Sequence, residues 1–318
     1  MYFTQHFWEL LFQGIRLGSL YALIAIGYTM VYGVLQLINF AHSEVFMSGA
    51  LGGVFMLTAL AGTNGNIPSG FSAFEYTALA LIAGAVVSAA VAFSLERVAY
   101  RPLRKRHAPK LVYLITAIGA SIFLYNLAGK LFGRNNLQVP ESFHSGPVFV
   151  LPGTGPSGPR TVKTLDVLII VTAFVMMIVL DLVINRTKLG SGIRAVAQDA
   201  ETAQLMGVDV GKVISRTFII GGLLAGVGGV LYAMFHAVSY TMGFIPGIKA
   251  FTAAVLGGIG NVRGAMLGGL LLGIVESFSQ GIIPNGLEWV DVVSFVVLVV
   301  VLLIRPTGIL GERTGRAA

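Results

Sequence analysis

His42 and Glu44 are the residues whose types and spacing first suggest chemistry, because they stand two positions apart between two apolar runs. A histidine and a carboxylate can ligate a metal ion or exchange a proton. A zinc site needs three or four ligands, however, and no third ligand stands at a helical spacing from this pair. We therefore interpret His42 and Glu44 as polar groups at a break in a helix, with a short interfacial turn as the alternative.

A second polar stretch is Leu189–Ile214, with the sequence LGSGIRAVAQDAETAQLMGVDVGKVI. Apolar or small residues recur in it at intervals of three and four, which predicts a single amphipathic helix from Gly192 to Met206. Gly207 is the expected C-terminal stop of that helix. A docking surface for a soluble partner is the favoured interpretation, and a solvated connector is the alternative. The recurring residues are Ile193, Val196, Ala197, Ala200, Ala203 and Met206.

The composition around these stretches is that of a membrane protein. Of 318 residues, 55% are hydrophobic and 11% are charged, and the mean hydropathy is +0.83. A soluble domain would carry about 25% charged residues. The sequence therefore predicts an all-α polytopic protein surrounded by membrane lipid. The net charge of +7 reflects basic loops rather than a nucleic-acid partner, and the absence of cysteine excludes disulfides and thiolate metal sites.

Eight apolar runs are long enough to be spans, or nearly so. They form one transmembrane domain over residues 1–318, and the first is an uncleaved span rather than a signal peptide. The runs are Leu11–Leu35, Val45–Ala61, Tyr76–Leu95, Leu111–Leu131, Leu165–Ile184, Val213–Phe235, Lys249–Val275 and Val290–Ile304.

The basic loops predict the orientation of these spans. Glu96–Lys110 is the most basic stretch, and we expect it to be a cytoplasmic loop. Basic residues place segment 186–212 and the C-terminus on the same side, whereas Thr63–Phe74 has no Lys or Arg and is expected outside. Counting back through three spans places the N-terminus outside. The C-terminal basic residues are Arg305, Arg313 and Arg316.

Counting forward, Lys249–Val275 must begin and end on the external side, which one helix cannot do. A re-entrant pair of half-helices, broken near Gly257–Arg263, satisfies the count, and an unrecognised extra span would also satisfy it. A similar break is expected in Leu35–Ala50. Two breaks in corresponding halves point to an inverted-repeat transporter with its pathway at the breaks. The pathway residues expected from these breaks are Asn39, Phe40, His42, Glu44, Gly257, Gly258 and Gly260.

Three other features receive simpler interpretations. The GxxxG pairs Gly14/Gly18, Gly222/Gly226 and Gly269/Gly273 are expected to pack helices closely, as are the overlapping pairs around Gly264. Glu276 and Asp181 are expected to be solvated near span ends. The segment Phe132–Thr164 is rich in Pro and Gly and is expected to be an external surface loop, ordered in places.

The residues resemble a known family from end to end. Ala197–Ala200, with Ala203 and Gly207, resembles the cytoplasmic coupling loop of ABC importer permeases. Stretches such as INFAHSEVFMSGA, ERVAYRPLR and KAFTAAVLGGIGNVRGAMLGG are similar to the LivH-type permease subunit of branched-chain amino-acid importers. Ser43 departs from the glycine expected there. The resemblance implies a type II-like fold and a coupling loop at 186–212, with site residues Arg194, Ala197, Asp199, Ala200, Ala203 and Gly207.

The resemblance also implies a multi-subunit system in the bacterial cytoplasmic (inner) membrane. Its other members are a second, LivM-like permease, two cytoplasmic LivF/LivG-like ATPases, and a periplasmic or lipid-anchored solute-binding protein. It implies ATP-driven import of Leu, Ile and Val. The chain lacks a GxxxxGK[ST] motif, so we expect no cofactor on it and no enzymatic activity of its own, with ATP used by the partners.

Two alternatives remain open from the sequence. A urea or short-amide importer would have the same architecture. A stand-alone secondary transporter or channel would need a coupling carboxylate deep in a span and would leave the 189–214 stretch unexplained.

Overall fold

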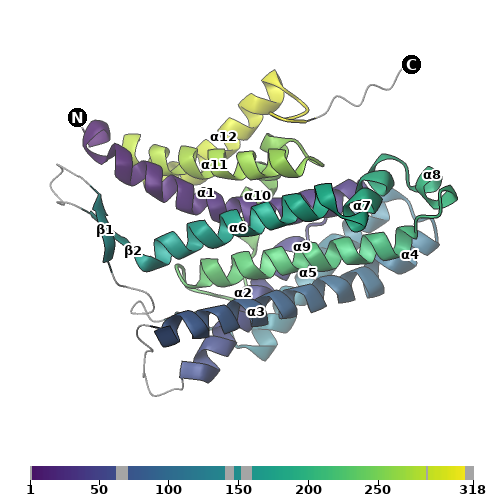
Figure 1. The fold of residues 1–318 in the computed structure, drawn as a ribbon, viewed down its shortest axis with the longest axis horizontal. Helices are drawn as coiled ribbons and strands as arrows, with labels where there is room; N and C mark the ends of the chain where they lie inside the picture. Colours follow the sequence, from purple (N-terminus) through teal and green to yellow (C-terminus); the bar gives the residue numbers. More distant parts are fainter. Residues whose placement is uncertain (1, 62–70, 140–146, 152–159, 284–285, 312–318) are drawn as a thin grey trace. The chain divides into compact units, whose positions relative to one another are not determined.

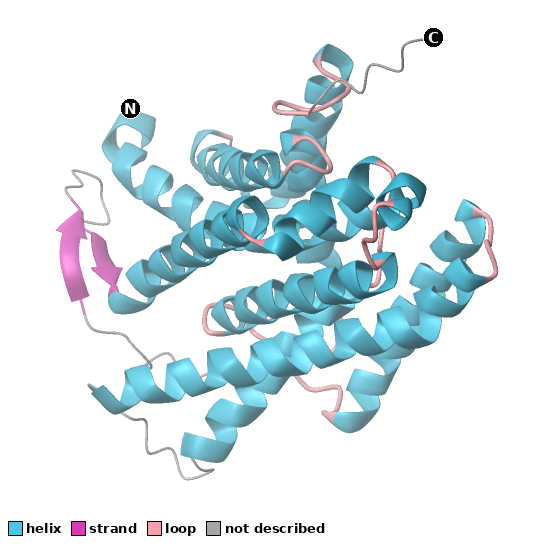
Figure 2. Cartoon of the chain, turned by 45° about the vertical axis from the view of Figure 1, so that its right-hand side comes forward, coloured by secondary structure: helices cyan, strands magenta, loops and turns pink. Residues whose placement is uncertain are grey.

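The structure is a computed structural model that describes residues 2–61, 71–139, 147–151, 160–283 and 286–311, most of them helical (Figures 1 and 2). In this part of the chain eight helices are long and apolar enough to cross a membrane. The all-α polytopic class is thereby confirmed. The elements are α1 (Tyr2–Leu35), α2 (His42–Ala61), α3 (Phe71–Leu95), η1 (Glu96–Tyr100), α4 (Arg101–Lys105), α5 (Lys110–Leu131), β1 (Pro147–Leu151), β2 (Arg160–Lys163), α6 (Thr164–Arg186), α7 (Lys188–Gln198), α8 (Ala200–Leu205), α9 (Val210–Ala233), α10 (Phe244–Gly257), α11 (Val262–Ile282) and α12 (Gly286–Ile304).

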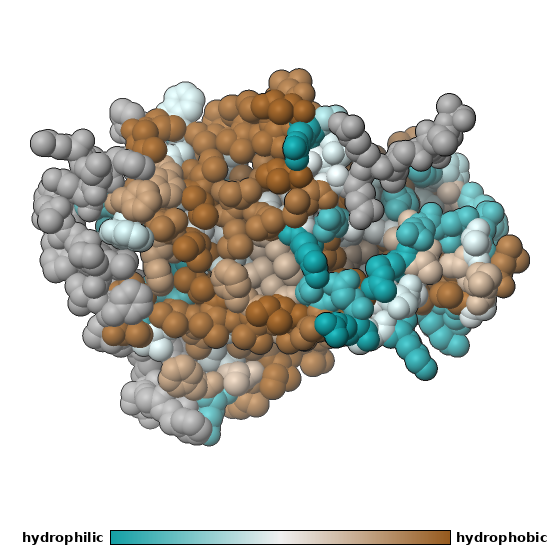
Figure 3. Space-filling view, turned by 45° about the horizontal axis from the view of Figure 1, so that its top comes forward, coloured by the Kyte–Doolittle hydropathy of each residue, from teal (hydrophilic) through white to brown (hydrophobic). Residues whose placement is uncertain are grey.

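Apolar side chains dominate the visible surface, as helices that face lipid require (Figure 3). The most exposed of the large ones include Leu287 on α12, which is 82% exposed, and Phe55 on α2, which is 66% exposed. In a soluble protein such exposed apolar side chains would promote aggregation. Here they are the face that hydrocarbon covers.

The basic stretch 96–110 is largely helical, which corrects the expectation of a loop. Helix α3 continues through the π-helical turn η1 and through α4, so that one helical segment runs from Ser72 to Lys105. Pro102, which has no N–H to donate, closely follows the π-helical turn η1. Helix α4 ends at Lys105 with Arg106 as its cap, and the following His107 has a positive φ of 48°.

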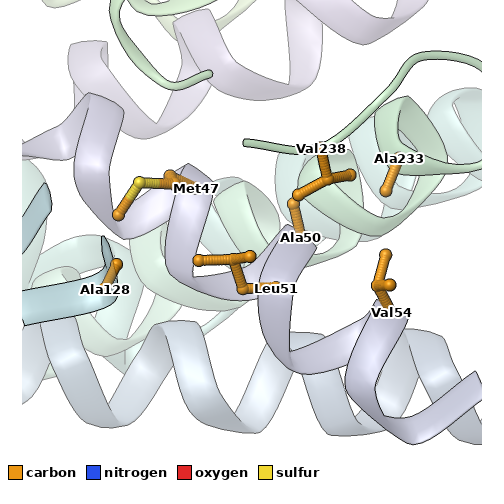
Figure 4. Close-up of a cluster of buried hydrophobic side chains, with 7 residues drawn as sticks. All are labelled: Met47, Ala50, Leu51, Val54, Ala128, Ala233 and Val238. Atoms are coloured by element: carbon orange, nitrogen blue, oxygen red, sulfur yellow. The ribbon is translucent and has the colours of Figure 1, made fainter. Parts of the chain in front are cut away.

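The chain divides into two compact units, each built from segments distant in the sequence. One comprises residues 1–29, 144–177 and 249–318, and the other comprises residues 30–143 and 178–248. In the second unit α2, α3 and α9 pack against one another. Figure 4 shows the adjoining apolar cluster, in which α2 contributes Met47, Ala50, Leu51 and Val54, joined by Ala128, Ala233 and Val238.

Glycines bring helices into backbone contact in both units, which confirms the packing interpretation of the pairs involved. In the first unit, a Cβ added to Gly18 of α1 would lie 2.8 Å from Leu270 Cα of α11. In the second, a Cβ added to Gly226 of α9 would lie 2.7 Å from Ala85 Cα of α3. A methyl group at either place would force the helices apart.

Segment 132–164 contains a short antiparallel hairpin, β1 paired with β2, which agrees with a surface segment ordered in places. Earlier in this segment, Leu137 forms an isolated bridge with Val238. Most of the loop expected at Thr63–Phe74, the proline-rich residues 152–159, and Arg313 and Arg316 lie outside the described residues.

The predicted break in Lys249–Val275 is present, but its two limbs are unequal. Helix α10 has 14 residues, whereas α11 has 21 and is long enough to span the membrane by itself. The expectation of two half-helices is therefore wrong for the second limb. Positive φ angles at Gly258 (110°) and Gly260 (95°) make the turn, and the Asn261 side chain caps α11.

Candidate functional site

The polar stretch after α6 forms two helices, and this corrects the prediction of one helix from Gly192 to Met206. Helix α7 ends because Asp199 adopts an extended conformation (φ −155°, ψ 110°). The Asp199 carboxylate then caps α8 by accepting the backbone N–H groups of Glu201 (2.9 Å) and Thr202 (3.2 Å). An aspartate at this place favours a new helix start over continuation.

The Asp199 carboxyl group has a pKa lowered by these contacts. The largest cause is the hydrogen bond from the Thr202 hydroxyl, at 2.5 Å, followed by the bond from the Thr202 backbone. Each bond favours the ionised form. Asp199 therefore remains a capping anion in α8 at neutral pH.

One side of the α7–α8 segment packs against the rest of its unit, and the other side is exposed. Ile193 and Val196 of α7 and Ala203 of α8 are buried, which agrees with the predicted apolar face. Arg194 donates to the backbone carbonyl of Ile184 and so ties α7 to the end of α6. Ala197 is half-buried and Ala200 is exposed, so these two do not share the burial of the others.

The C-terminal end of α8 presents large apolar side chains to solvent. Leu205 is 87% exposed and Met206 is 81% exposed. Met206 was predicted to share one helix face with Ile193, Val196 and Ala203, which are buried, and the start of a new helix at Ala200 changes its direction. Gly207 follows with a φ of +86°, which confirms the predicted C-terminal glycine.

The break between α1 and α2 gathers the predicted polar residues. The Asn39 side chain accepts from the Tyr100 hydroxyl (2.6 Å) and from the Ala41 backbone N–H (3.1 Å), which fixes the turn into α2. His42 is buried, and Phe40 is 36% exposed. At the start of the same break, the Gln36 side chain donates to the Ala197 carbonyl of α7 at 3.4 Å.

Glu44 is the buried carboxylate of this break. Its Oε1 accepts from the Ser121 hydroxyl of α5 at 3.1 Å and from the Ser43 hydroxyl at 3.3 Å. Ser121 lies near the middle of α5, which has 22 residues, so α2 begins deep beside a full-length span. Ser43, the departure from the expected glycine, places its hydroxyl 3.3 Å from Glu44 Oε1 and 2.8 Å from the Phe40 carbonyl, and its single proton is donated to one of these acceptors at a time.

The predicted pathway glycines lie in the other unit, at the turn between α10 and α11. A Cβ on Gly258 would lie 2.5 Å from the Gly311 backbone N, and the Leu310 N–H donates to the Gly257 carbonyl at 2.9 Å. The Asn261 side chain also donates to the Leu310 carbonyl, at 2.9 Å. The residues after α12 thus pack against this turn. Gly260 has open space around its Cα.

Sequence analysis missed a charged cluster around Glu276. This residue is fully buried rather than solvated, so that expectation was wrong. Its carboxylate accepts from Lys249 Nζ (3.1 Å to Oε1) and from the Tyr21 hydroxyl (2.9 Å), and Ser294 donates as well. Lys249 also pairs with Asp291 at 2.8 Å. A charge within an apolar run was the available signal, because such a charge needs a partner.

Among the described residues, no group of three or more His, Asp or Glu side chains is placed to hold a metal ion. The polar clusters are pairs of carboxylate with hydroxyl, amide or ammonium groups. Such groups can bind and orient a polar solute or a partner backbone.

Comparison with known proteins identifies the family of the chain. A family profile described as branched-chain amino acid transport system / permease component matches residues 10–302. The chain belongs to this family. The permease is 42% identical over 308 residues to the high-affinity branched-chain amino acid transport system permease protein LivH of Escherichia coli (strain K12), with 96% of each chain covered.

Two further relatives show the same extent of similarity. The permease is 43% identical over 309 residues to the high-affinity branched-chain amino acid transport system permease protein BraD of Pseudomonas aeruginosa, with 96% of each chain covered. It is 41% identical over 309 residues to LivH of Salmonella typhimurium, again with 96% of each chain covered. The predicted resemblance to LivH-type permeases is confirmed.

Proposed function

We propose that this permease is the translocating subunit of an ATP-driven importer that carries leucine, isoleucine and valine into the cytoplasm. The observation that carries the proposal is the match over 96% of the chain to permeases named for high-affinity branched-chain amino-acid transport. These relatives are named for branched-chain amino-acid transport, which favours amino acids over urea as cargo. A zwitterionic cargo also suits a break at which polar groups meet inside a bundle.

The proposed system contains a second, LivM-like permease, two LivF/LivG-like ATPases and an external solute-binding protein. The permease sequence has no GxxxxGK[ST] motif, so the energy of ATP must reach it through a docking surface. We assign the α7–α8 segment to this docking and place it in the cytoplasm. The C-terminus then lies on the same side and the N-terminus outside.

The exposed end of α8 supports this assignment. Leu205 and Met206 form an apolar tip beside exposed polar groups, and the buried Ile193 and Val196 hold the segment to its own unit. A partner that moves the tip would move α7 with it. The bond from Gln36 to the Ala197 carbonyl then connects α7 to the break that precedes α2. To drive transport, the ATPases must bind the two states of the permease unequally.

The proposed pathway runs past the two breaks. Asn39, Phe40, His42 and Glu44 are its candidates in one unit, and Gly257, Gly258 and Gly260 are its candidates in the other. The support is strongest for Glu44 and His42, which are ionisable side chains buried at a helix start. It is weaker for Gly257 and Gly258, whose backbones already pack against the residues after α12.

Reconstitution tests the proposal directly. Proteoliposomes that contain the permease with its co-permease, ATPases and loaded binding protein should accumulate labelled leucine only when ATP is supplied, and excess valine should suppress this uptake. Uptake of urea in place of leucine would overturn the substrate. Leucine movement by the permease alone, driven by an ion gradient, would overturn the ABC assignment.

The coupling assignment has its own test in Asp199→Lys. This change removes the cap of α8 and places a cation at its start, so we expect ATP-dependent uptake to be lost while the protein remains in the membrane. Glu201→Lys makes the same charge change and leaves the cap in place, and it should impair uptake less. Wild-type uptake by Asp199→Lys, with normal ATPase association, would contradict the assignment.

A further inference from the structure

Four carboxylates are buried in the described part of the permease, and Glu44 differs from the other three. Glu276 pairs with Lys249, Glu96 pairs with Arg104 at 3.0 Å, and Asp166 pairs with Arg16. No described cation pairs with Glu44, which is only 3% exposed. Burying an ionised carboxylate without a counter-charge is costly, so Glu44 is stabilised there either by a proton or by a cationic ligand.

The two oxygens of Glu44 also differ from each other. Oε1 accepts from the hydroxyls of Ser121 and Ser43, whereas Oε2 is buried and has no hydrogen-bond partner among the described residues. An ionised carboxylate can accept about four hydrogen bonds, so Oε2 keeps unused capacity. The hydroxyls hold the group in one orientation, and the free oxygen is turned toward the start of α10.

The backbone of Gly243 covers that free oxygen. A Cβ added to Gly243 would lie 3.3 Å from Glu44 Oε2 and would overlap the Ser43 carbonyl. Gly243 belongs to the turn that ends where α10 begins, and it lies in the same unit as Glu44. A movement of this turn away from α2 would uncover Oε2 without breaking either hydroxyl contact.

We propose that Glu44 Oε2 accepts the ammonium group of the amino acid as it passes through the permease. This inference rests on the proposed function, because it takes an α-amino acid as the cargo. One carboxylate matches one ammonium in charge, and it falls far short of the six to eight oxygens that a calcium ion takes. Urea carries no ammonium, so the same group would favour amino acids over urea.

The test compares two variants that separate charge from size. Glu44→Gln keeps the length of the side chain and an oxygen for the hydroxyls but removes the charge. Glu44→Asp keeps the charge and shortens the side chain. Initial rates of ATP-dependent leucine uptake are measured in proteoliposomes that hold the complete complex, normalised to the amount of assembled complex.

We expect Glu44→Gln to lower the rate roughly ten- to hundredfold, which corresponds to loss of one charge-assisted hydrogen bond. Glu44→Asp should retain more activity than Glu44→Gln. A purely structural role predicts the opposite order, because glutamine fits the same space. ATP hydrolysis stimulated by the loaded binding protein should remain comparable in Glu44→Gln, so that more ATP is used for each leucine moved.

A second arm identifies the source of the positive charge. Uptake is repeated with sodium and potassium replaced by choline. If the wild-type rate collapses in choline and Glu44→Gln is insensitive to the replacement, an inorganic cation occupies the site and the inference is overturned. Equal uptake by wild type and Glu44→Gln would also overturn it, while leaving the proposed function intact. Uptake of urea without leucine by the wild type would overturn both.

Discussion

Glu276 and Glu44 are both buried carboxylates, one in each unit, yet their surroundings are opposite. Glu276 has an ammonium, a phenol and a hydroxyl around it, from Lys249, Tyr21 and Ser294. Glu44 has two hydroxyls on one oxygen and nothing described on the other. A carboxylate that finds a cation and hydrogen-bond donors within its own chain stabilises the fold. A carboxylate with one oxygen left without a partner is available for a ligand.

The largest expected effect on stability comes from removing the ammonium group that pairs with Glu276. Lys249→Met leaves Glu276 without its ammonium in the interior, and we expect the free energy of unfolding to fall by about 3–5 kcal/mol. Thermal unfolding of the purified protein in detergent would measure the loss. The double variant Lys249→Met/Glu276→Leu removes both charges and should recover most of the lost unfolding free energy.

Glu44→Gln is the matching change in the other unit. If Glu44 is not part of a completed ion pair, its neutral isostere should alter the free energy of unfolding by less than about 1.5 kcal/mol. A loss as large as that of Lys249→Met would show that Glu44 has a structural counter-charge. The comparison between the two carboxylates would then fail.

Removal of single hydroxyls sharpens the same comparison. Ser294→Ala deletes a bond to Glu276, which pairs with Lys249, and should cost about 1.5–3 kcal/mol in unfolding free energy. Ser121→Ala deletes one of two hydroxyls on Glu44 Oε1 and should cost about 0.5–1.5 kcal/mol. Chemical unfolding of the two variants side by side would measure both losses of unfolding free energy. Equal losses would argue that Glu44 and Glu276 are equally well supplied with partners from the chain.

The smallest effect is expected at Asp199, a carboxylate that is fully exposed. Its lowered pKa means that its capping contribution is present above the ordinary carboxyl pKa of about 3.9 and is lost as the pH falls through the lower native value. Asp199→Ala should speed hydrogen exchange in α8 roughly two- to tenfold. The ratio of variant to wild-type rates should be the same at pH 7 and pH 5, and a ratio that falls between them would contradict this account.

Local features were predictable because their causes are local. The apolar runs, the glycine pairs and the stop at Gly207 depend on residues within a few turns of one another, and the structure confirms them. The break at Gly257–Asn261 was predicted from its glycines. The second helix start at Asp199 was missed. The spacing of apolar residues gives no information about a side chain that caps the backbone of the residues that follow it.

The sequence by itself determined the membrane class, most of the spans and the breaks that precede α2 and α11, since hydropathy and glycine content act over short distances. Tertiary structure decided which buried carboxylate is satisfied. Lys249 and Glu276 are 27 residues apart, and Ser121 and Glu44 are 77 apart. Neither pairing follows from residue types. Only the packing of helices brings an ammonium to one carboxylate and hydroxyls to the other, because the electrostatic interaction depends on distance in space.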